Sequence, residues 1–127
     1  MASTARCCQV TTTVPDRALA DRLATALVEE RLAACVQVAG PIESAYRWQG
    51  RLERSTEWHC HCKTTLDRAP ALQRRVRELH PYEVPEIVVV PLVDGDPSYL
   101  RWIEESVRTD ASAAGPSLPG AALPPRG

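Results

Sequence analysis

The chain has 127 residues, of which 44% are hydrophobic and 24% are charged, and this length suits one globular domain better than two. Fifteen basic and sixteen acidic residues give a formal charge of −1, so we expect no nucleic-acid partner, because such binding needs a broad basic surface. No apolar run approaches the ~20 residues that cross a bilayer, and residues 1–6 lack the apolar core of a secretory signal. We therefore expect a cytoplasmic protein without membrane association.

The amino end of the chain predicts a strand followed by a helix. Cys7–Val14 is rich in β-branched residues and stops at Pro15, which favours a strand. Asp16–Leu32 then predicts an amphipathic helix that Asp16 can cap. Its apolar stripe consists of Leu19, Leu23 and Leu27.

The next segment predicts a long β-hairpin. Ala34–Trp48 has β character and is interrupted by Gly40-Pro41, so we expect one long strand with a bend or bulge at Gly40. Gln49-Gly50 predicts a tight turn, after which Arg51–Thr64 runs back as the partner strand.

The carboxyl half predicts a helix, a strand and a short helix. Leu66–His80 has helical spacing of apolar residues, with Asp67 in the cap region. Glu86–Val93 is the most apolar strand, and its Pro91 indicates either a sheet edge or the point where pairing with a neighbouring strand stops. A short helix opens at Asp96-Pro97.

The order βαββαβ, followed by a short helix, predicts a fold of the α+β class. It is the ferredoxin-like arrangement, in which two helices cover one face of a four-stranded antiparallel sheet. The other face is then left uncovered, so we expect other copies of the chain to bury it.

Proline and glycine are frequent at the carboxyl end, where residues 110–127 hold four of the eleven prolines. This composition is typical of disorder, so we predict a folded domain over residues 1–109 and a disordered tail over residues 110–127. The number of cysteines, five, is odd and the apolar content is adequate for a core, so reduced thiols are expected.

Four motifs resemble the CutA divalent-cation tolerance proteins, and they occur in the order and spacing of that family. The resemblance covers about Val10 to Val107. The motifs are Glu30–Val36, Tyr46–Glu53, Glu78–Ile87 and Gly95–Ile103.

The resemblance implies a ferredoxin-like homotrimer in the cytoplasm with a link to copper and other divalent metals. It also implies similarity to the trimeric PII signalling proteins. A copper site in bacterial relatives matches His80 here, and the family carboxylate near that cleft matches Glu57. The family cysteine of that site is replaced by Thr12, a poor ligand for a soft metal. His80 and Glu57 are therefore the predicted ligands of a weak site for Cu or another divalent cation, and no cofactor is required.

His80 also has a purely structural interpretation. It ends the second predicted helix, where an imidazolium interacts favourably with the helix dipole. Tyr46, Trp48, Tyr82 and Trp102 are aromatic residues that can line a binding cleft or anchor a trimer interface, and we favour the interface.

The run His59–Cys62 contains four residues that are common metal ligands. On a strand, His59 and His61 share one face while Cys60 and Cys62 share the other, so the four residues cannot bind one ion together. We predict core packing for the two cysteines. Packing or hydrogen bonding at a subunit interface is favoured for the two histidines, with metal binding as the alternative.

No catalytic motif of the G-x-S-x-G or H-E-x-x-H kind is present, and the chain has no Asn. We therefore expect a non-enzymatic protein of metal tolerance. Two alternatives remain: a PII-like sensor that accepts an anionic small molecule beside His80, and a purely structural assembly module.

Overall fold

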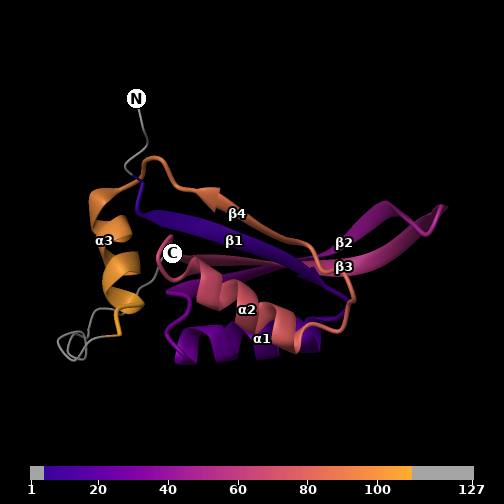
Figure 1. Cartoon of the computed structure of the whole chain (residues 1–127), viewed down its shortest axis with the longest axis horizontal. Coiled ribbons are helices and arrows are strands. Elements are labelled where there is room, and N and C mark those ends of the chain that lie inside the picture. Colours follow the sequence, from indigo (N-terminus) through magenta and orange to yellow (C-terminus); the bar gives the residue numbers. More distant parts are fainter. Residues whose placement is uncertain (1–4, 110–127) are drawn as a thin grey trace.

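The computed structural model describes residues 5–109 and has an α+β fold (Figure 1). Four strands form one antiparallel sheet in the order β2-β3-β1-β4. The predicted ferredoxin-like arrangement is confirmed, whereas the predicted tail over residues 110–127 lies outside the described residues. The elements are β1 (Cys7–Val14), α1 (Arg17–Glu29), β2 (Cys35–Trp48), β3 (Arg51–Thr65), α2 (Ala69–Leu79), β4 (Ile87–Pro91) and α3 (Pro97–Ser106).

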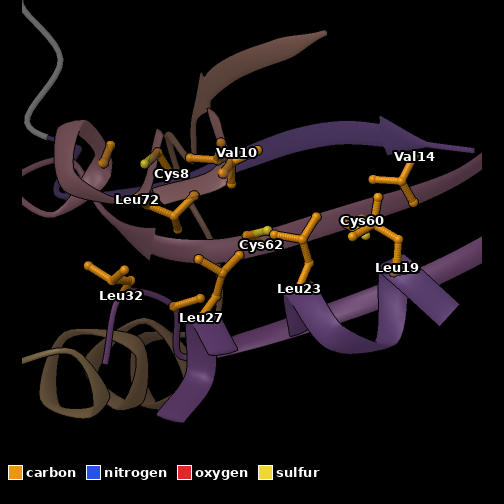
Figure 2. Packing of buried hydrophobic residues seen from close by; sticks show 14 residues of the cluster. Cys8, Val10, Val14, Leu19, Leu23, Leu27, Leu32, Cys60, Cys62 and Leu72 are labelled. Carbon is orange, nitrogen blue, oxygen red and sulfur yellow. The ribbon is translucent and has the colours of Figure 1, made fainter. Parts of the chain in front are cut away.

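Helices α1 and α2 cover one face of the sheet and enclose the main core (Figures 1 and 2). Leu23, Leu27 and Leu72 are fully buried there, and each buried leucine contributes roughly 1.5–3 kcal/mol to stability. Cys60 and Cys62 enter the same core from β3. The predicted packing role of these two cysteines is confirmed.

Helix α1 is shorter than predicted, because it ends at Glu29 instead of Leu32. Arg31 adopts a left-handed conformation with φ of 60°. The backbone N–H groups of Leu32 and Ala33 both donate to the carbonyl of Leu27, which satisfies the end of the helix and turns the chain towards β2.

Helix α2 begins at Ala69, three residues later than predicted. Residues 66–68 form a turn in which the N–H of Arg68 donates to the carbonyl of Thr65. Arg68 occupies the N-cap position without a side-chain hydrogen bond, and Asp67 lies in the cap region, one residue before it. Strand β4 spans Ile87–Pro91 and lies at the sheet edge, as its proline indicated.

Strands β2 and β3 extend past the rest of the sheet as a long hairpin (Figure 1). The predicted bulge lies between Ala39 and Ile42. A Cβ atom on Gly40 would lie 2.7 Å from Cδ1 of Trp58, so only glycine fits this close approach. At the tip, Gln49 and Gly50 both have positive φ, as a two-residue hairpin turn requires.

The face of the sheet opposite α1 and α2 is called the open face below. Alternation along the strands places these side chains on it: Gln9, Thr11, His59, His61, Val88 and Val90. Helix α3 packs at one end of the sheet, where Ile103 and Val107 form a second cluster with Cys7. The open face is therefore covered by α3 at this end of the sheet, and the prediction of an uncovered face is correct for the rest of it.

Candidate functional site

A cleft of about 1060 Å³ lies between the β2–β3 hairpin and the segment that joins α2 to β4. Its walls include Tyr46, Trp48 and Tyr82, three of the four aromatic residues singled out from the sequence. Trp102 lies elsewhere, on α3, where its ring stacks on Tyr99 with centroids 5.6 Å apart. The cleft has the size and the aromatic walls of a ligand site.

The charged groups of this cleft are mostly negative. One guanidinium, that of Arg47, lines it together with four carboxylates. A concave surface lined by one sign of charge concentrates ions of the opposite sign, so the cleft attracts cations. The four carboxylates are those of Glu53, Glu57, Glu83 and Glu86.

Glu57 is the buried carboxylate of the cleft, with 6% of its surface exposed. Strand β3 holds it directly before the register shift, opposite Ile42. The hydroxyl of Tyr82 donates a 2.8 Å hydrogen bond to its Oε2 atom. Burial, together with this hydrogen bond and the charge of Glu57, raises the pKa of Tyr82, so the phenol remains a donor at neutral pH.

His80 follows the last residue of α2 and is buried. Its Nδ1 atom accepts a 3.2 Å hydrogen bond from the backbone N–H of Tyr82. In the neutral ring, Nε2 must then carry the proton, and it donates to the carbonyl of Thr13 at 2.7 Å. His80 thus joins the end of α2 to the end of β1, and both of its ring nitrogens have partners.

The two predicted ligands, His80 and Glu57, are connected through Tyr82. The Tyr82 ring lies against the His80 ring, with centroids 4.7 Å apart, while its hydroxyl binds Glu57. Glu57 lines the cleft, whereas His80 is not among the lining residues. Within residues 5–109, no three His, Cys, Asp or Glu side chains are grouped so that they could hold a metal ion.

Thr12, at the position of the family cysteine, is fully buried. It pairs with Cys60 of β3, and its Oγ1 atom has no hydrogen-bond partner within residues 5–109. Thr12 therefore contributes no ligand to the cleft.

Sequence reasoning missed three of the four carboxylates, namely Glu53, Glu83 and Glu86. Strand periodicity could have found the first, because Glu53 and Glu57 are four residues apart and share a face of β3. The other two lie in the loop and extended segment before β4, where no periodicity places a side chain.

These features define a ferredoxin-like domain with a long hairpin and a cation-attracting cleft at its base. Residues 8–106 match the family described as "CutA1 divalent ion tolerance protein". The chain therefore belongs to the CutA1 family, as the four motifs indicated.

Relatives agree with this assignment in sequence and in structure. The chain is 48% identical over 94 residues to the divalent-cation tolerance protein CutA of Thermus thermophilus, covering 74% of this chain and 91% of that protein. The crystal structure of CutA from Xylella fastidiosa matches with a TM-score of 0.79 at 37% identity, covering 81% and 99% of the two chains. A CutA structure from Archaeoglobus fulgidus, described as periplasmic, matches with a TM-score of 0.78 at 33% identity, covering 80% and 99%.

Proposed function

We propose that this protein acts in divalent-metal tolerance by binding a divalent cation such as Cu²⁺ weakly and reversibly in the hairpin cleft, without catalysis. The observation that carries the proposal is the excess of four carboxylates over one guanidinium along the cleft. In this proposal Glu57 is the ligand at the base of the cleft, and water completes the coordination. A site with so few protein ligands is weak and open.

His80 has a different role in this proposal from that of Glu57. It would bind an ion only by giving up its hydrogen bond to Thr13 or to Tyr82. We therefore assign it as a positioning residue that orients Tyr82, and through Tyr82 the carboxylate of Glu57.

Calorimetric titration with Cu²⁺ tests the proposal. We expect saturable binding to the wild type, at least about tenfold weaker binding to Glu57→Gln, and a smaller loss in His80→Gln. Glu78→Gln is the control, because Glu78 lies on α2, is exposed and pairs with Arg75. The absence of saturable binding, or equal affinity in wild type and Glu57→Gln, would overturn the assignment.

We also propose that the functional unit is a homotrimer. Large apolar side chains are exposed on the hairpin and on β4, with Leu52 at 68% and Val90 at 52%. Such exposure is costly on a lone subunit, and burial by other copies removes it. Sedimentation equilibrium at micromolar concentration tests this proposal, and a monomer would contradict it.

A small-molecule sensor of the PII type is the second candidate. The aromatic walls and the volume of the cleft favour this role. The carboxylates argue against the anionic ligand of this alternative. A rise in melting temperature with nucleotides or carboxylates, but not with metals, would favour the sensor. No response to either class would favour the structural assembly module.

The cytoplasmic location stays a prediction, since one relative is described as periplasmic. No helix within residues 5–109 combines the length and the apolar character needed to cross a membrane.

A further inference from the structure

Two imidazole rings lie side by side on the open face, away from the hairpin cleft. His59 and His61 are two residues apart on β3, so strand alternation points both side chains to the same side of the sheet. Their ring centroids are 5.0 Å apart and their planes differ by 28°. This arrangement belongs to a single chain and requires no other copy.

The surroundings of His61 resemble those of a metal-binding histidine. Its Nδ1 atom lies 3.1 Å from the hydroxyl of Thr11 and 3.4 Å from the side-chain amide of Gln9. A hydroxyl can accept as well as donate, and an amide can turn over, so Nδ1 can carry the ring proton and donate it to Thr11. Within residues 5–109 Nε2 then has no hydrogen-bond partner and can bind a metal, and the hydrogen bond at Nδ1 fixes the ring.

His59 has more freedom. Its neighbours across the strands are Thr13 and Ala39, and within residues 5–109 neither ring nitrogen has a hydrogen-bond partner. Rotation of this ring about its side-chain bonds can therefore bring a nitrogen towards Nε2 of His61. Two metal–nitrogen bonds of roughly 2.0–2.1 Å allow the nitrogens to be at most about 4 Å apart, a spacing that stacked neighbouring rings can reach.

We propose that His59 and His61 form a two-imidazole site for a borderline divalent cation such as Cu²⁺, Ni²⁺ or Zn²⁺. This site is additional to the hairpin cleft, because neither His59 nor His61 is among the residues that line the cleft. Water completes the coordination. The expected order of affinity is Cu²⁺ above Ni²⁺ and Zn²⁺, with Mn²⁺ the weakest, as imidazole ligands dictate.

The charges around the pair are mixed. Lys63 lies on the same face and disfavours a cation, but its ammonium group donates to the side chain of Gln37 at 3.0 Å. Burial, the neighbouring His59 and Lys63 lower the pKa of His61, while Glu86 opposes them. The site itself rests on the geometry of the two rings and on the hydrogen bond that orients His61.

The proposed trimer would cover much of the open face, which affects how an ion reaches the pair. The titration is therefore carried out both on the folded protein and during refolding from denaturant.

Titration with Ni²⁺ and Cu²⁺ tests this inference in wild type, His59→Gln, His61→Gln and the double variant. We expect each single variant to bind at least about tenfold more weakly than wild type and the double variant to lose this site. Glu57→Gln should keep the site, so failure of the cleft proposal is distinguishable from failure of this one. Lys63→Gln, on the same strand and face, should bind more tightly.

Circular dichroism verifies that each variant folds, and a second measurement compares the wild type with the double variant. The electron paramagnetic resonance spectrum with one equivalent of Cu²⁺ should contain nitrogen couplings that are absent in the double variant. The inference is overturned if the double variant binds Ni²⁺ and Cu²⁺ as tightly as the wild type, both when folded and during refolding. It is also overturned if the wild-type spectrum lacks nitrogen couplings that depend on the two histidines.

Discussion

The hydroxyl of Tyr82 donates a 2.8 Å hydrogen bond to the carboxylate of Glu57, and this contact connects the segment after α2 to strand β3. Through it the buried carboxylate is oriented at the base of the cleft.

Tyr82→Phe should lower the free energy of unfolding by about 1–3 kcal/mol, because the buried Glu57 loses its donor. Tyr46→Phe is the matched control. Its ring lines the same cleft but is 44% exposed, so a change within about 0.5 kcal/mol is expected. Urea denaturation measures both, and equal effects would refute the importance of the bond.

His80→Ala should destabilise the fold by about 1–3 kcal/mol, because the carbonyl of Thr13 and the N–H of Tyr82 lose their partner. His80→Gln should lose less, since its amide nitrogen can still donate to the carbonyl. If urea denaturation shows that His80→Gln is no more stable than His80→Ala, the hydrogen bond from His80 to the carbonyl of Thr13 does not stabilise the fold.

Gly40→Ala should destabilise by about 1–3 kcal/mol, because its Cβ would lie 2.7 Å from Trp58 and 3.2 Å from the carbonyl of Glu57. The control is Gly95→Ala, whose Cβ would meet Leu100 at ordinary contact distances of 3.4–3.6 Å. That change should stay within about 0.5 kcal/mol. A tolerated alanine at position 40 would contradict the close packing at the bulge.

The lowered pKa of His61 predicts how stability changes with pH. In the unfolded chain this pKa is near its ordinary value of about 6.5, so on acidification the unfolded state binds the proton first. The contribution of neutral His61 to the free energy of unfolding is therefore fully present above about pH 6.5. It is lost as the pH falls towards the lower pKa that His61 has in the folded protein. His61→Gln should therefore reduce the slope of unfolding free energy between about pH 7 and pH 5. An unchanged slope would contradict the environment set by His59, Lys63 and Glu86.

The cysteine thiols of the core should resist alkylation in the native protein. Burial raises the pKa of Cys8 and of Cys60 to about 11, so few reactive thiolates form at neutral pH. Mass spectrometry after iodoacetamide treatment should find these two residues unmodified until denaturant is added. Rapid modification of native Cys60 would contradict its place in the core.

Much of the fold could be predicted because apolar spacing is a local property of the sequence. The stripe of Leu19, Leu23 and Leu27 predicted the face of α1 that is buried, and alternation correctly separated Cys60 from its histidine neighbours. The ends of the helices were less accurate. The end of α1 depends on Arg31, which adopts a left-handed conformation although arginine does not favour it. The start of α2 depends on the turn before Ala69, and the residues of that turn do not predict where the helix begins.

The site was only partly predictable, for a related reason. The resemblance identified Glu57 and His80, and the hairpin aromatics were visible as a motif. The hydrogen bond between His80 and Thr13 joins residues far apart in the chain, so no local pattern reveals that both ring nitrogens are occupied.

The central claim, a divalent-cation site at Glu57, is tested most directly by anomalous diffraction from crystals soaked in Cu²⁺. We predict a copper peak in the hairpin cleft next to the Glu57 carboxylate, and its loss in Glu57→Gln. A map with no peak in the cleft of the wild-type protein would contradict the claim.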